Sequence, residues 1–242
     1  MYSFYYVCYY FMLFFIMSIV GYIAECSFVS LGNKKVTLNR GFLMGPYIPI
    51  YGVGACSMVI FLKKYLSDPI VFFFMTSVIC SFIEYITSYV MEKLFGVRWW
   101  DYTDERFNVN GRICLKNSFL FGLAGLVFMY TLYPVINLFL FGIPYKALII
   151  MAIICFIIFA SDFIFTVKAL INVKSSLKNI KGDATEEIHE KISENLKKHQ
   201  FQFNRLIKSH PGIERFNGEA FNEFRNRMIE IRNNMKQNKI SK

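Results

Sequence analysis

Long apolar stretches separated by short polar segments dominate the first 170 or so residues of the chain. Five stretches are long enough, or nearly so, to cross about 30 Å of hydrocarbon as helices. They cover residues 4–28, 42–62, 69–91, 118–141 and 147–167. Because every backbone polar group must be satisfied inside a bilayer, we expect these stretches to be helical. The pattern predicts an all-α protein, a polytopic membrane helix bundle of about five spans.

The second stretch has an irregular pattern, because it reads RGFLMGPYIPIYGVG at its start. Pro46 and Pro49 each lack an amide donor, and a proline ring clashes with the preceding helical turn. We therefore expect a broken helix or a short re-entrant hairpin over 42–62. Such backbone is tolerated at membrane depth only against protein or a wet cavity.

A polar, basic tail follows the last apolar stretch. From Lys168 to Lys242 it contains 16 Lys and Arg and 9 Asp and Glu. We predict a transmembrane helical domain over 1–172 and a cytosolic helical tail over 173–242. Asp183 and Glu186 form a capping-box pattern for one tail helix, and a second follows Pro211. The two helices either bury their apolar stripes against each other or offer them to a partner or a second copy.

The distribution of basic residues predicts the orientation, because cytosolic loops are enriched in Lys and Arg. With five spans and a cytosolic tail, the N-terminus lies outside a bacterial plasma membrane. If 42–62 is re-entrant instead, the number of crossings changes and this support is lost. The five-span arrangement places eight basic loop residues inside and three outside: Lys34, Lys35, Arg40, Lys93, Arg98, Arg106, Arg112 and Lys116 against Lys63, Lys64 and Lys146.

Composition narrows the function classes. Because 55% of the residues are hydrophobic, we expect a lipid bilayer as partner. The net charge is +10, but no nucleic-acid recognition motif accompanies it, so we expect no nucleic acid as partner. Its six cysteines include no CxxC pair, which favours buried thiols, and we expect no metal and no cofactor. Without a P-loop, HExxH or GxSxG motif, the chain is more readily explained as a non-enzyme.

Candidate site residues come from ionisable side chains within the apolar stretches. An acid near the bilayer centre costs roughly 2.5–3.5 kcal/mol on insertion scales, and Glu84 is the deepest. On the predicted topology Glu25, Arg40, Glu92 and Asp162 also fall in the inner half of the membrane. They either form structural ion pairs that lock the helices together or line a polar pocket open to the cytosol.

The polar-aromatic run WWDYTDERFNVNGRICL, residues 99–115, follows the third stretch. Asp101 and Tyr102 are placed to cap or hydrogen-bond the pocket. Asn110 and Gly111 favour a tight turn with positive φ that presents Arg112. Arg40 and Arg112 would then bind an anionic or lipid head group, with the carboxylates setting arginine geometry or relaying protons.

Several motifs give the chain a resemblance to a known family. RGFLMGPYIPIYGVG, EYITSYVMEKLF, WWDYTDERFNVNGRICL and HPGIERFN are similar to segments of the bacterial ABC-transporter type IV family, also called CmpB. The resemblance implies a multi-pass transport permease, and Tyr51 joins the candidate site through the shared motif. The candidate substrate-binding residues are Glu25, Arg40, Tyr51, Glu84, Glu92, Asp101, Tyr102, Asn110 and Arg112.

Three functions stay open from the sequence. The chain is a permease working with a separate ATP-binding subunit, an intramembrane enzyme or binder of a lipid-linked phosphate, or a structural or regulatory protein assembling through its tail. A homo-oligomer is compatible with each of them.

Overall fold

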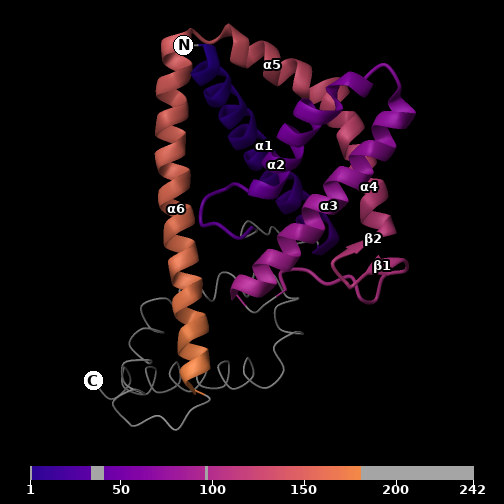
Figure 1. The fold of residues 1–242 in the computed structure, drawn as a ribbon, viewed down its shortest axis with the longest axis vertical. Helices are drawn as coiled ribbons and strands as arrows, with labels where there is room; N and C mark the ends of the chain where they lie inside the picture. The colour runs from indigo at the N-terminus through magenta and orange to yellow at the C-terminus, as the bar shows by residue number, and fades with distance from the viewer. Residues whose placement is uncertain (1, 34–40, 96–97, 181–242) are drawn as a thin grey trace. The chain divides into compact units, whose positions relative to one another are not determined.

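The computed structural model describes residues 2–33, 41–95 and 98–180, and these residues are mostly helical (Figure 1). The helices are α1 (Tyr2–Asn33), α2 (Pro49–Ser57), α3 (Pro69–Phe95), α4 (Leu115–Val127), α5 (Tyr133–Gly142) and α6 (Tyr145–Ile180). A π-helix, η1 (Met58–Leu62), and a 3-10 turn, η2 (Lys63–Tyr65), extend α2. A second π-helix, η3 (Phe128–Leu132), joins α4 to α5. The predicted all-α membrane helix bundle of about five spans is confirmed.

Within the described residues, four helical segments are long and apolar enough to cross a membrane: Ser3–Leu31, Pro69–Phe95, Leu115–Gly142 and Tyr145–Lys168. The segment from α2 to η2 is shorter. Its residues 49–65 rise about 25 Å at helical geometry, slightly less than a typical hydrocarbon core. Whether this segment crosses or re-enters stays a prediction.

The backbone before α2 is irregular, as the sequence predicted. Residues 41–48 are non-helical, and Gly41 has a φ of +92°. Ile48 is extended, with φ −120° and ψ 101°, because the ring of Pro49 disfavours helical geometry in the residue before it. Pro49 then starts α2, where its missing amide hydrogen is not needed.

Helix α2 packs closely against α1 in the antiparallel direction. The backbone N–H of Ile48 donates to the carbonyl of Ser18 at 2.9 Å, and further along α2 the Cys56 thiol lies 3.4 Å from the carbonyl of Tyr10. A Cβ on Gly52 would lie 2.4 Å from the Phe14 carbonyl oxygen. Glycine at this position therefore permits the close crossing of the two helices.

Helix α3 has a well-defined start and a close neighbour. The Asp68 carboxylate accepts hydrogen bonds from the N–H groups of Ile70 at 3.0 Å and Val71 at 3.1 Å, so it caps the helix. Further along, a Cβ on Gly122 of α4 would lie 2.4 Å from the Phe73 ring. The two helices thus approach through a position without a side chain.

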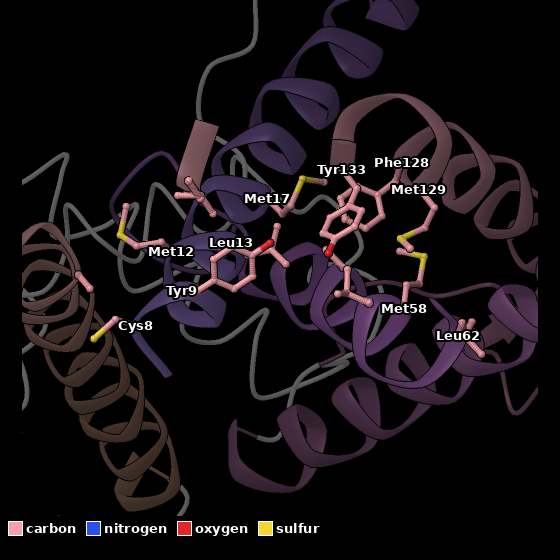
Figure 2. Close-up of a cluster of buried hydrophobic side chains, with 14 of the residues drawn as sticks. Cys8, Tyr9, Met12, Leu13, Met17, Met58, Leu62, Phe128, Met129 and Tyr133 are labelled. Atoms are coloured by element: carbon pink, nitrogen blue, oxygen red, sulfur yellow. The ribbon is translucent and has the colours of Figure 1, made fainter. Parts of the chain in front are cut away.

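A cluster of buried apolar side chains connects α1, the α2–η1 segment and the η3–α5 segment (Figure 2). Leu13, Leu62 and Met129 are at most 2% exposed in this cluster. Several members are methionines, whose flexible side chains suit the irregular surfaces left by π-helical turns. The cluster holds the helices together on the side of the fold away from the loop after α3.

The chain divides into two compact units. One comprises Met1–Val90 and Asp101–Val167, and the other Met91–Trp100 and Lys168–Lys242. In the second unit, the ring centroids of Phe95 and Trp99 are 5.8 Å apart. The predicted tail helices lie outside the described residues, and the division into 1–172 and 173–242 stays a prediction.

Candidate functional site

Glu84 is a buried acid in the middle of the apolar helix α3. Its side chain is 6% exposed, and its Oε1 accepts a hydrogen bond from the Tyr102 hydroxyl at 3.0 Å. Its Oε2 is buried and has no hydrogen-bond partner among the described residues. A buried acceptor without a donor costs free energy, so this oxygen marks a place where a partner is needed.

Tyr102 links Glu84 to helix α4. Its hydroxyl accepts a hydrogen bond from Asn117 Nδ2 at 2.6 Å while donating to Glu84. Burial raises the pKa of Tyr102, and the neighbouring Glu84 carboxylate raises it further, so the phenol stays protonated and keeps its donor. Asn117 was missing from the sequence-derived site. Its polar amide near the start of an apolar helix was the available signal.

A second carboxylate lies close to Glu84. Glu25 on α1 accepts a hydrogen bond from the Tyr51 hydroxyl at 3.0 Å, and it interacts electrostatically with Glu84. The Tyr51 ring fits against α1 because residue 21 is glycine, where a Cβ would lie 2.3 Å from the Tyr51 Cγ. The fold therefore brings two acids and two tyrosine hydroxyls together from α1, α2, α3 and the loop after α3.

A short hairpin after α3 positions Arg112. Strands β1 (Asn108–Val109) and β2 (Ile113–Cys114) pair antiparallel, with Val109 opposite Ile113. Asn110 has a φ of +53° and Gly111 a φ of +66°, which confirms the predicted tight turn with positive φ. Asn110 Nδ2 donates to the Tyr85 hydroxyl on α3 at 2.9 Å.

The Arg112 side chain is 8% exposed and lies on α3. Its Nη1 donates to the Ser88 hydroxyl at 3.2 Å, and its guanidinium carbon is 5.8 Å and 5.4 Å from the ring centroids of Tyr85 and Tyr89. These are cation–π distances. Among the described residues, no lysine or arginine forms an ion pair with Glu25 or Glu84. Glu84 and Arg112 thus form no ion pair with each other.

The remaining predicted residues have separate environments. Asp101 accepts hydrogen bonds from the backbone N–H and the hydroxyl of Thr103 within a local turn. Glu92 pairs with Arg98 at 2.7 Å, and both belong to the second compact unit. Arg40 lies outside the described residues, so its predicted role stays a prediction.

Asp162 on α6 is surrounded by hydrogen-bond donors. Its carboxylate accepts hydrogen bonds from the backbone N–H groups of Met44 at 3.1 Å and Gly45 at 2.8 Å. The Tyr47 hydroxyl at 2.6 Å and the Thr166 hydroxyl at 3.0 Å donate as well. Asp162 therefore anchors the irregular segment 41–48 to α6 through hydrogen bonds.

A family model described as "Putative ABC-transporter type IV" matches residues 12–167, more than half of the chain. The chain belongs to this family. This membership and the long apolar helices both indicate a multi-pass membrane protein. No curated protein and no solved structure matches the chain. The matched span includes Glu25, Tyr51, Glu84, Tyr102 and Arg112, whereas the motif at 210–217 lies beyond it.

Proposed function

We propose that this chain is the permease component of an ABC-type transport system in a bacterial plasma membrane. A separate ATP-binding subunit would supply the energy, because the chain carries no P-loop of its own. Family membership supports the transporter class, and the helices supply the membrane path. In this proposal the N-terminus lies outside and the basic tail is cytosolic, where it can contact the ATP-binding subunit or a second copy.

The observation that carries the proposal is the buried Glu84, inside a helix that can span a membrane, with one carboxylate oxygen that receives no hydrogen bond from the described residues. Acids at such positions commonly mark substrate or ion pathways. Tyr102 donates a hydrogen bond to this acid. Glu25 interacts with it electrostatically and accepts a hydrogen bond from Tyr51. Arg112, from the hairpin, contacts α3 one turn further along, at Ser88. We assign the solute-binding role to this group, with Tyr102 and Asn117 positioning the Glu84 carboxylate.

An anionic solute was predicted from Arg40 and Arg112. Arg112 donates to Ser88 and lies over two tyrosine rings, and these contacts hold its guanidinium beside α3. The proposed transport role does not depend on the sign of the solute charge. It depends on Glu84 being part of the solute path.

Purification of the tagged chain from its native host after mild cross-linking tests the permease role. We expect a protein with a Walker A motif to co-purify, and the reconstituted complex to hydrolyse ATP. Glu84→Gln and Arg112→Ala should abolish transport-coupled hydrolysis while leaving membrane expression intact. Glu105→Gln is the matched control, because Glu105 pairs with Lys116 on the exposed side of the hairpin.

Absence of any ATP-binding protein from the cross-linked complexes would contradict the proposal. So would full activity in both Glu84→Gln and Arg112→Ala, because the polar group would then serve only to hold the fold together. Recovery of enzymes of lipid-linked intermediates in place of an ATPase would favour the intramembrane enzyme.

A further inference from the structure

The polar group around Glu84 has an excess of acceptors over donors. A carboxylate offers two oxygens with about four lone-pair positions. Glu84 and Glu25 each receive one tyrosine hydroxyl on Oε1, from Tyr102 and Tyr51. The described residues supply no donor to Glu84 Oε2. The ligand that fits this oxygen is therefore one that brings donors or positive charge.

The electrostatic interactions around Glu84 also favour a positively charged ligand. Glu25 and Glu84 act on each other and both act on Tyr51, so the two carboxylates share one region. Two ionised carboxylates in an apolar surrounding repel each other, and a positive charge placed between them removes this cost. Neither acid has an ion pair with a described lysine or arginine, so the described residues do not supply that charge.

The buried Arg112 contacts the next turn of α3. Arg112 donates to Ser88 and lies against the rings of Tyr85 and Tyr89, one helical turn from Glu84. Two tyrosines beside the acids also suit a cationic group, because hydroxyl and carboxylate oxygens coordinate alkali cations and accept hydrogen bonds from ammonium groups.

We infer that Glu25 and Glu84, with the hydroxyl of Tyr51, form a binding site for one singly charged cationic group. The group is either an inorganic monovalent cation or the ammonium group of a solute. This inference rests on the proposed function in taking Glu84 as part of the solute path, and it replaces the predicted anionic ligand with a cationic one. Glu84 Oε2 and the Glu25 carboxylate are the oxygens that face the ligand.

Thermal unfolding of the purified full-length chain in lipid nanodiscs tests the site, followed by tryptophan fluorescence. Sodium, potassium or methylammonium chloride replaces N-methyl-D-glucamine chloride at constant ionic strength and pH. We expect a saturable rise in Tm of a few °C with at least one of the three small cations, because a ligand that binds only the folded state stabilises it. A response to methylammonium alone assigns the site to an ammonium group, and a response to sodium or potassium assigns it to an inorganic cation.

Glu84→Gln and Glu25→Gln should raise the half-saturating cation concentration at least tenfold, whereas Glu105→Gln should leave it unchanged. If Glu84→Gln does not fold, Glu25→Gln carries the test, because Glu25 is only half-buried. An identical Tm in all four salts would overturn the site, as would a cation response that persists in both glutamine variants. The assay contains no ATPase, so a missing ATP-binding partner would defeat the permease role without affecting this result.

Discussion

At the residue scale, two acids in apolar helices have opposite environments. Asp162 receives four donors and is satisfied, whereas Glu84 has one oxygen without a donor among the described residues. In sequence both appear as an isolated acid in an apolar helix. The difference comes from what packs against each: the donor-rich irregular backbone of 41–48 for Asp162, and a second acid for Glu84.

Asp162→Ala should destabilise the fold. Removing the carboxylate leaves the N–H groups of Met44 and Gly45 and the Tyr47 hydroxyl without their acceptor, and hydrogen bonds to charged groups contribute about 1.5–3 kcal/mol. We expect a loss on the order of 2–3 kcal/mol in the free energy of unfolding. Thermal unfolding of the purified variant measures it.

Ser161→Ala is the matched control, because the exposed Ser161 hydroxyl donates only to the Ile158 carbonyl of its own helix at 2.9 Å. Its Tm should stay within about 1 °C of the parent, since surface changes of this kind are usually within 0.5 kcal/mol. Equal Tm values for Asp162→Ala and the parent would show that the segment 41–48 is held by other contacts.

At the element scale, glycine positions set how closely the helices approach. The Pro and Gly pattern of 42–62 predicted a broken element, and the structure places its helical part from Pro49 onward. The sequence did not show which glycines serve the turn and which serve helix contact. Gly41 takes a positive φ, whereas Gly52 makes room for the α1 backbone.

Gly52→Ala should destabilise the α1–α2 contact although alanine favours helix formation. The added Cβ would lie 2.4 Å from the Phe14 carbonyl oxygen, and backbone cannot move as a flexible side chain does. Overpacking of this kind costs about 1–3 kcal/mol. Denaturation of the purified variant, followed by circular dichroism, measures the loss.

Gly54→Ala, on the same helix, provides the comparison. Its Cβ would lie 3.8 Å from the Cys80 sulfur, an ordinary contact distance, so the gain in helix propensity of up to about 1 kcal/mol should dominate. A Gly52→Ala variant as stable as Gly54→Ala would mean that α1 and α2 can separate without cost.

At the scale of the whole molecule, the number of crossings fixes which side each loop faces. In the part of the chain that the structure describes, four segments meet the length and apolarity of a span, and the α2–η2 segment is shorter. A crossing by this segment puts the loops around residues 34 and 64 on opposite sides. Re-entry would put both on the same side.

Single cysteines at positions 34, 64 and 104 of a cysteine-free variant should separate these arrangements. For five crossings with the N-terminus outside, a membrane-impermeant maleimide should label Lys64→Cys in intact cells. Lys34→Cys and Asp104→Cys should react only after permeabilisation. Labelling of position 34 or 104 from outside would overturn this five-crossing arrangement, and equal accessibility of positions 34 and 64 would indicate re-entry.

Elements with local signals could be predicted from the order of residues alone. Apolar length predicted the helices, prolines predicted the break before α2, and Asn110 with Gly111 predicted the positive-φ turn, because each depends on neighbouring residues in the chain. The position of Glu84 within an apolar stretch likewise identified it as an acid whose insertion into a bilayer costs free energy.

The partners of these residues depend on how the helices pack against one another. The Asn117 amide donates to Tyr102, the Tyr51 hydroxyl donates to Glu25, and Arg112 donates to the Ser88 hydroxyl. Such contacts join residues that are distant in sequence and depend on helix rotation and crossing, which apolar helices do not encode in their hydrophobic pattern. The physical reason is that lipid-facing and protein-facing surfaces of a membrane helix are both apolar, so close packing and hydrogen bonds select the contacts.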